Sequence, residues 1–313
     1  MPGAISGLVD FDPEKDIPSL QGKVVFVTGG TAGLGKSSVL AFAKHNPIHV
    51  YFTGRNAEAG AAVVEEIKGI DPNVGATFIK VDMMSLADLK AACSQFSHDR
   101  LDVLLCNAGI MNQPPGLSSN GYEKHFATNH LGNAMITKQL LPILLKTAEK
   151  LESDVRIVNL TSLGWQLHSK RGIDFDDLRN AKPGFLRSYY HYGESKLANI
   201  VYARELARRY STIMAVSVHP GVVKTDLVNN LSVARKAVVY VSQYLMGVSL
   251  MEEWQGCLNQ LWAAAGAKRG DLVNGAFYRP VGVLSNDMLD DVAKDTELGE
   301  NLWSWTEEVL ANY

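Results

Sequence analysis

The sequence has few cysteines, no basic excess and no long apolar run. Its three cysteines, Cys93, Cys106 and Cys257, are widely separated. An odd count without a CxxC pair disfavours a disulfide framework and fits a reducing compartment. No His, Cys or Asp cluster has ligand spacing, so we predict no metal. Thirty Lys and Arg against 33 Asp and Glu give a net charge of -3, which does not indicate nucleic-acid binding.

The chain also lacks the marks of secretion and of membrane insertion. Four acidic residues fall within its first twenty, where a signal peptide would have a basic start and an apolar middle. No stretch reaches the roughly 18 apolar residues of a membrane span. The nearest, Ala237–Met251, is short and contains serine and glutamine, which favours a buried helix or a lid. We therefore expect a cytoplasmic protein without a membrane span.

Short apolar runs alternate with helical patterns from residue 23 onward. The runs are almost continuous in Val, Ile, Leu and Phe, which is typical of strands buried on both faces of a parallel sheet. The alternation predicts an α/β fold with a doubly wound parallel sheet of about seven strands and helices on both faces. The predicted strands are Lys23–Thr28, Ile48–Thr53, Thr77–Val81, Asp102–Cys106, Val155–Leu160, Ile213–Val218 and one near Ala276–Tyr278.

No linker or repeat divides the chain. Residues 1–21 are expected to form a loose N-terminal arm, and residues 22–313 a single domain. Leu163–Ser188 is polar and contains glycine and proline, which predicts a long loop. Residues 226–270 are predicted to be an inserted helical region, of which about 226–251 would be a lid over a substrate.

The first strand leads into a glycine-rich turn, Thr28-Gly29-Gly30-Thr31-Ala32-Gly33-Leu34-Gly35. Glycine permits a positive φ there and lets a phosphate approach the N–H groups at the start of the next helix. Three glycines placed in this way favour a dinucleotide site. Gly35-Lys36-Ser37 also partly matches a P-loop ATPase, although Asp82 is the only candidate for its acidic strand end.

Gly54-Arg55-Asn56 follows the second predicted strand, where an NAD-preferring site would carry an acidic residue for the ribose hydroxyl. Arg55 cannot accept that hydrogen bond, but it can pair with a 2′-phosphate through two charge-assisted bonds. The position therefore favours NADP(H). The alternative is a solvated surface arginine.

A tyrosine and a lysine four residues apart begin a predicted helix. At this spacing Tyr192 and Lys196 project from one face. A nearby ammonium lowers the pKa of a phenol from about 10, which makes the tyrosine a usable proton donor. Such a pair alone is more often an exposed helix face. Ser162 and Asn107-Ala108-Gly109, however, follow two other strands at the edge where ligands of open sheets bind, and Asn129 lies in mid-helix, an unfavourable position for an amide.

These motifs, in this order, resemble the short-chain dehydrogenase/reductase family. The chain is similar to the non-extended branch, and within it to retinol dehydrogenase-like and fungal-type reductases, through Thr53–Asn56, Gly172–Leu178 and Ser195–Asn199. The resemblance runs from about Gly22 to Tyr278. The matched positions are Thr28, Gly29, Gly33 and Gly35 for TGxxxGxG, Asn107–Gly109, Asn129, Ser162, Tyr192 and Lys196 for YxxxK, and Pro220-Gly221 followed by Thr225.

The resemblance implies a single Rossmann domain that binds NADP(H), with Lys36 merely opening the helix after the turn. It implies that Tyr192 exchanges a proton with the substrate oxygen, that Lys196 lowers the pKa of Tyr192 and holds the ribose, and that Ser162 orients the carbonyl. Asn129 would support a water-mediated proton relay from Lys196. The implied cofactor-binding residues are Thr28, Gly29, Thr31, Gly33, Leu34, Gly35, Arg55, Asn56, Asp82, Met83, Asn107, Ala108, Gly109, Tyr192, Lys196, Pro220, Gly221, Val222 and Thr225.

Apolar and aromatic side chains in the segments after Ser162 and after Gly221 predict a hydrophobic small-molecule substrate. The alternative is that they pack in the core. The predicted substrate-binding residues are Leu163, Trp165, Tyr189, Leu227, Leu231, Tyr240 and Tyr244. The resemblance also allows a homodimer or homotetramer formed through the long helices that carry Asn129 and Tyr192.

The leading hypothesis is an NADPH-dependent ketoreductase or alcohol dehydrogenase. A C=C or imine reductase, or a dehydratase on the same scaffold, is an alternative within enzymes. A non-catalytic NADP-sensing regulator is an alternative of another class, although none of the catalytic positions is lost.

Overall fold

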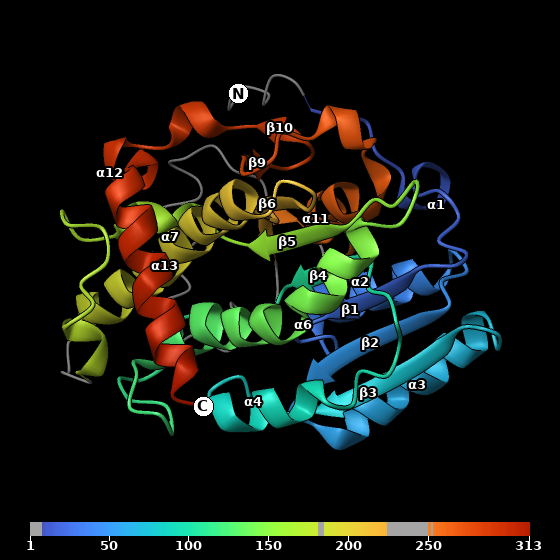
Figure 1. Ribbon diagram of the computed structural model, residues 1–313, viewed down its shortest axis with the longest axis horizontal. Helices are drawn as coiled ribbons and strands as arrows, with labels where there is room; N and C mark the ends of the chain where they lie inside the picture. The colour runs from blue at the N-terminus through green and yellow to red at the C-terminus, as the bar shows by residue number, and fades with distance from the viewer. Residues whose placement is uncertain (1–7, 181–184, 224–249, 252) are drawn as a thin grey trace.

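In a computed structural model, which describes residues 8–180, 185–223, 250–251 and 253–313, the chain forms one twisted sheet with helices on both faces (Figure 1). The strand order is β10-β9-β6-β5-β4-β1-β2-β3, and every neighbouring pair is parallel except β9 and β10. The α/β fold and its parallel sheet are thus confirmed. The strands are β1 (Val24–Val27), β2 (His49–Gly54), β3 (Gly75–Lys80), β4 (Val103–Cys106), β5 (Arg156–Leu160), β6 (Met214–Val218), β9 (Phe277–Arg279) and β10 (Val283–Leu284).

Both faces of the sheet are apolar, which explains the continuous hydrophobic runs. Along β1, Val24 and Phe26 belong to one buried cluster, while Val25 and Val27 belong to the other. Successive side chains of a strand point to opposite faces, so a strand covered by helices on both sides needs apolar residues throughout.

Each face has its own set of helices. The first cluster contains residues of α4, α6, α7 and α13, and the second contains residues of α2, α3 and α11. The helices are α2 (Gly33–Ala43), α3 (Ala57–Ile70), α4 (Leu86–Cys93), α5 (Lys124–Phe126), α6 (Gly132–Ala148), α7 (Phe185–Arg209), α11 (Leu258–Leu261) and α13 (Thr296–Ala311), with shorter α1 (Pro13–Asp16), α10 (Glu253–Gly256) and α12 (Asp291–Lys294).

The C-terminal helix α13 packs against α6 and α7 on the side away from the sheet (Figure 1). Lys138 of α6 and Glu307 of α13 form an ion pair at 2.6 Å. The rings of Tyr202 on α7 and Trp303 on α13 stack with their centroids 5.3 Å apart. Helix α13 therefore covers part of α6 and α7. A homodimer formed through these two helices would have to contact α13 as well, or use the parts of α6 and α7 that α13 leaves exposed.

The N-terminal segment is not a loose arm over its described part. Phe11, Ile17 and Leu20 are buried in the second cluster, and the backbone N–H of Val9 donates to the carbonyl of Val281 at 3.0 Å. Apolar side chains at these three positions attach residues 8–20 to the domain, although the segment also carries four acidic residues.

The segment predicted as a long loop is partly helical. Leu163–Leu167 and Asp177–Arg179 are 3-10 helices, and α7 already begins at Phe185. The predicted lid at 226–251 lies outside the described residues except for its last two. These residues, Leu250–Met251, form β8 and pair with β7 (Val222–Val223) in a separate two-stranded sheet. Within the described ranges, no helix is long and apolar enough to cross a membrane.

Candidate active site

The C-terminal ends of four adjacent strands bring the sequence motifs together. β1, β4, β5 and β6 are neighbours in the sheet and all run in the same direction. The glycine-rich turn, Asn107–Gly109, Ser162 and Pro220-Gly221 therefore meet at a single edge, where ligands of open α/β sheets bind.

Ser162 and Tyr192 lie side by side at this edge. A Cβ atom placed on Gly164 would be 2.7 Å from Cε1 of Tyr192 and 3.4 Å from Oγ of Ser162. A glycine at position 164 thus allows the 3-10 turn after Ser162 to lie directly against the tyrosine ring. The serine Oγ also accepts the backbone N–H of Gly164 at 3.1 Å, which fixes its orientation.

Lys196 and Asn129 converge beside Gly109. A Cβ on Gly109 would lie 3.1 Å from Oδ1 of Asn129 and 3.3 Å from Nζ of Lys196. The lysine Nζ is 5.8 Å from the centre of the Tyr192 ring and donates to the carbonyl of Leu160 at 3.2 Å. The structure therefore brings all four predicted catalytic residues into one group.

The electrostatics of this group differ from the expectation that Lys196 lowers the pKa of Tyr192. Burial raises the pKa of Tyr192, and its hydrogen bond with Ser162 offsets only part of that rise. Burial also lowers the pKa of Lys196 to about 8. The reason is geometric, since the ammonium donates to a backbone carbonyl and not to the phenol.

Asn129 lies in a π-helical turn, Ala127–Leu131, between α5 and α6. Such turns are frequent at functional sites. Its amide Nδ2 donates to the carbonyl of Ile110 at 3.0 Å and to Oγ of Ser195 at 2.9 Å, and its Oδ1 accepts the N–H of Ile110 at 2.7 Å. The Ser195 hydroxyl in turn donates to the carbonyl of Tyr192 at 2.7 Å. Asn129 thus connects the segment after β4 with the turn of α7 that carries the tyrosine.

The glycine-rich turn is as tight as its sequence predicts. Gly29 has a φ of +68°. A Cβ on Gly35 would come within 2.1 Å of the carbonyl oxygen of Gly29 and within 2.5 Å of Nδ2 of Asn107. The helix α2 that follows has Ala32 as its N-cap, with no side-chain cap and no acidic residue in its first turn. This end of the helix is suited to hold an anionic group.

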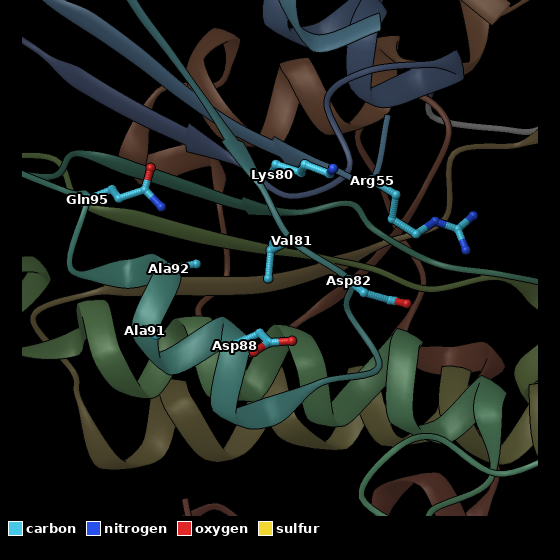
Figure 2. Close-up of a pocket in the computed structure, with 8 residues that line it drawn as sticks. All are labelled: Arg55, Lys80, Val81, Asp82, Asp88, Ala91, Ala92 and Gln95. Carbon is cyan, nitrogen blue, oxygen red and sulfur yellow. The ribbon is translucent and has the colours of Figure 1, made fainter. Parts of the chain in front are cut away.

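A hollow of about 510 Å³ lies beside the ends of β2 and β3 (Figure 2). Arg55 and Asp82, predicted to contact the cofactor, are among its lining residues, together with Lys80, which the sequence analysis did not single out. Asn56 lies next to it and caps α3, because its side-chain oxygen accepts the N–H of Ala59 at 3.1 Å.

The comparisons with known proteins agree with this geometry. A family model described as short chain dehydrogenase matches residues 23–172. The short-chain dehydrogenase/reductase drtF of Aspergillus calidoustus is 32% identical over 309 residues, covering 94% of this chain and 95% of its own. The chain belongs to the short-chain dehydrogenase/reductase family.

One further relative supports this assignment, and a solved structure supports the fold. Human retinol dehydrogenase 11 is 36% identical over 220 residues, covering 69% of this chain and 66% of its own. The crystal structure of a protein from Mycobacterium Paratuberculosis superimposes with a TM-score of 0.71 at 24% identity, covering 95% and 97% of the two chains. The sequence-based resemblance to fungal-type and retinol dehydrogenase-like members is thereby confirmed, and the protein is an oxidoreductase of a family that uses NAD(H) or NADP(H). The P-loop ATPase alternative is wrong.

Among the predicted substrate-binding residues, the structure separates core from edge. Trp165 is only 1% exposed and belongs to the first hydrophobic cluster. For this residue the structure therefore supports the alternative interpretation, packing in the core. Leu163 is partly buried against the same cluster, and Tyr189 lies on α7 one turn before Tyr192. Four further predicted substrate-binding residues lie outside the described residues: Leu227, Leu231, Tyr240 and Tyr244. The predicted cofactor-binding residue Thr225 also lies outside them.

Two residues at the site escaped the sequence analysis. Asn133 accepts the hydroxyl of Thr28 at 2.7 Å and donates to the carbonyl of Ala108 at 3.0 Å, and so joins two cofactor motifs. Its position, four residues after Asn129 on one helical face, was a signal that could have revealed it. Gln260 donates to Ser38 at 2.7 Å from a distant part of the chain, and nothing in the sequence indicates that contact. No group of three metal-ligating side chains occurs in the part of the chain that the structure describes.

Proposed function

We propose that the protein transfers hydride between NADP(H) and a carbonyl or alcohol group of a hydrophobic small molecule. The observation that carries the proposal is the placement of Tyr192, Ser162 and Lys196 together at the sheet edge that also holds the glycine-rich turn. A partly buried phenol beside a serine hydroxyl can exchange a proton with an oxygen placed between them. The name of the relative retinol dehydrogenase 11 refers to a hydrophobic alcohol, which supports the substrate class.

Each member of the group has a proposed role. The Tyr192 hydroxyl donates a proton to the substrate oxygen in reduction and takes it back in oxidation. Ser162 donates a hydrogen bond that orients the same oxygen. Lys196, whose Nζ lies beside Asn129 and Gly109, would hold the ribose of the cofactor, and Oδ1 of Asn129 would hold a water near this Nζ. The nicotinamide, when bound, supplies or accepts the hydride.

The fit of a dinucleotide rests on two features of this chain. Gly35 has no space for a side chain, and the N-terminus of α2 has no side-chain cap, so a diphosphate can approach its N–H groups. Arg55 lies at the rim of the hollow at the other end of the site (Figure 2). We assign to Arg55 the recognition of the 2′-phosphate of NADP(H).

Replacing Arg55 by alanine tests the cofactor preference. We expect the KM for NADPH to rise about tenfold to a hundredfold, because a charge-assisted pair with the 2′-phosphate is lost, while the KM for NADH changes by less than about threefold. Steady-state kinetics with both cofactors measure this. Lys68→Ala, which removes an exposed cation of the adjacent helix α3, is the control and should change neither value. Equal effects of R55A on the two cofactors would contradict the assignment.

The reaction itself is tested by product analysis. NADPH is incubated with the protein and a panel of hydrophobic ketones, aldehydes, enones and imines, and the products are identified by mass spectrometry. Formation of alcohols supports the proposal. Reduction of C=C or C=N bonds alone, or cofactor binding without any turnover across the panel, contradicts it.

A further inference from the structure

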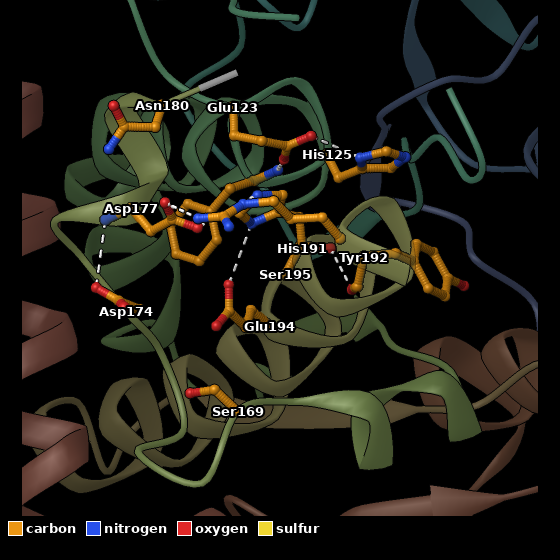
Figure 3. Close-up of polar contacts among 12 residues, drawn as sticks. Glu123, His125, Ser169, Asp174, Asp177, Asn180, His191, Tyr192, Glu194 and Ser195 are labelled. Atoms are coloured by element: carbon orange, nitrogen blue, oxygen red, sulfur yellow. Dashed lines mark hydrogen bonds and ion pairs between the residues drawn. The ribbon is translucent and has the colours of Figure 1, made fainter. Parts of the chain in front are cut away.

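A group of charged side chains, of which Glu123, His191 and Glu194 are buried, lies beside Tyr192 but has no part in the proposed chemistry (Figure 3). Its centre is His191, the residue before the tyrosine on α7, which is only 5% exposed. Its Nδ1 is 3.3 Å from Oε2 of Glu194 on the same helix, and its Nε2 is 3.6 Å from Oδ2 of Asp177. An imidazolium at this place therefore lies between two carboxylates from different segments.

The other charged groups around His191 come from three elements. Arg187 of α7 binds the second oxygen of Asp177. Glu123, the N-cap of α5, also faces His191, but it is engaged with His125 at 2.7 Å and with the N–H of Phe126 at 3.0 Å.

On the segment that contains Asp177, Asp174 lies close to Glu194, and Arg179 donates to the hydroxyl of Tyr122 at 2.6 Å. Carboxylates thus outnumber the cations that reach them, and His191 supplies the missing positive charge when it is protonated.

The sign of the electrostatics follows from this surplus. Burial by itself lowers the pKa of His191, but hydrogen bonding to Glu194 and the charges of Glu123, Glu194 and Asp177 outweigh it and hold the pKa above its ordinary value. For the carboxyl group of Glu194, burial acts in the opposite direction and raises the pKa. A raised histidine pKa means that its contribution to stability is fully present below about pH 6.5 and is lost as the pH rises through the higher folded-state value.

The contact joins segment Ile173–Arg179 to the turn of α7 that carries Tyr192. The segment Ile173–Arg179 is fixed to α5 by the N–H of Glu123, which donates to the carbonyl of Leu178 at 2.7 Å, and by burial of Ile173 and Leu178 in the core. Its attachment to α7 includes the contacts of Asp177 with Arg187 and His191. The next residue along α7 is Tyr192, so the position of that turn depends on what holds its outer side.

We propose that His191, as an imidazolium between Glu194 and Asp177, is a positioning residue that fastens segment 173–179 onto the turn of α7 that carries Tyr192. Loss of the proton weakens this attachment, so the segment loosens from α7 as the pH rises. The role of Tyr192 itself rests on the proposed function, whereas the fastening of the segment does not.

Hydrogen exchange tests the fastening without any substrate. In the wild type, after correction for intrinsic rates, we expect amides of residues 173–180 to exchange roughly fivefold faster at pH 9 than at pH 6. His191→Gln keeps a donor toward Glu194 but cannot titrate, so its exchange should be faster than wild type at pH 6 and independent of pH. His49→Gln is the matched control, because burial lowers the pKa of His49 to about 4 and this histidine is already neutral across the range. The same pH dependence in H191Q as in the wild type would overturn the proposal.

A second variant guards against simple loss of structure. The C2–H resonance of His191, assigned by its absence in H191Q, should titrate above the ordinary midpoint in the wild type. In Asp177→Asn the midpoint should fall, since one of the facing charges is removed. An unchanged midpoint would show that Asp177 does not hold the imidazolium.

An activity measurement then separates this inference from the proposed function. With a substrate from the panel, the kcat of the wild type should fall as the pH rises through the pKa of His191, whereas the kcat of H191Q should not show this fall. The KM for NADPH should be the same in both proteins. Absence of turnover in the wild type would contradict the proposed function but leave the exchange result standing. Equal kcat profiles for H191Q and wild type would overturn the effect on Tyr192.

Discussion

Replacing Tyr192 by phenylalanine is expected to lower kcat by about three orders of magnitude, with little change in the affinity for NADPH. General acid–base catalysis by a positioned side chain contributes about 10²–10⁴-fold, and the substitution removes the hydroxyl while keeping the ring. The ring is partly buried and is in close contact with its neighbour Gly164, so phenylalanine should retain the packing. Turnover of a ketone substrate and NADPH binding by fluorescence measure the two effects.

Tyr190→Phe is the matched control for this experiment. Tyr190 lies on the same helix two residues earlier, but it is 47% exposed, and loss of its hydroxyl should leave kcat within about twofold. A Tyr192→Phe variant that turns over at the wild-type rate would show that another group supplies the proton. The mechanism proposed for Ser162 and Lys196 would then fail with it.

The sheet was predictable because its strands are buried on both faces. Seven apolar runs predicted seven strands, and each is present within a few residues of its predicted bounds. The remaining strand of the large sheet, β10 (Val283–Leu284), is an edge strand of only two residues. It is too short to give an apolar run in the sequence. Helix α13 was not identified either, although Leu302, Thr306 and Val309 are buried along one face. No motif lies near it, and its partner surfaces on α6 and α7 become visible only in three dimensions.

The site was predictable in composition but not in its connections. The four-residue spacing of Tyr192 and Lys196 identified this pair on a helix. The end of a strand identified Ser162, because parallel strands bring their C-terminal ends to one edge. The direction in which Lys196 donates depends on the carbonyl of Leu160, a backbone group that no pattern of side chains encodes. The hydrogen bond from Gln260 to Ser38 joins residues 222 positions apart, so a sequence read in local windows carries no sign of it.

Replacing Gly35 by alanine should affect both the fold and the cofactor site. The added Cβ would lie 2.1 Å from the carbonyl oxygen of Gly29 and 2.5 Å from Nδ2 of Asn107. Neither atom can move freely, because Asn107 donates to the carbonyls of Thr28 and Gly29 at 2.9 and 3.2 Å. We expect the free energy of unfolding to fall by about 2–3 kcal/mol. We expect NADPH affinity to fall on the order of a hundredfold, since the turn must shift by a large fraction of an ångström.

Gly69→Ala provides the matched control on the neighbouring helix α3. A Cβ at Gly69 meets no atom within 4 Å and the residue lies in the last turn of α3, so alanine should stabilise the protein by about 0.5 kcal/mol. Urea unfolding and calorimetric titration with NADPH measure both quantities for the two variants. If Gly35→Ala bound NADPH as tightly as Gly69→Ala, the diphosphate could not lie against this turn. The dinucleotide would then have to be held elsewhere along the sheet edge.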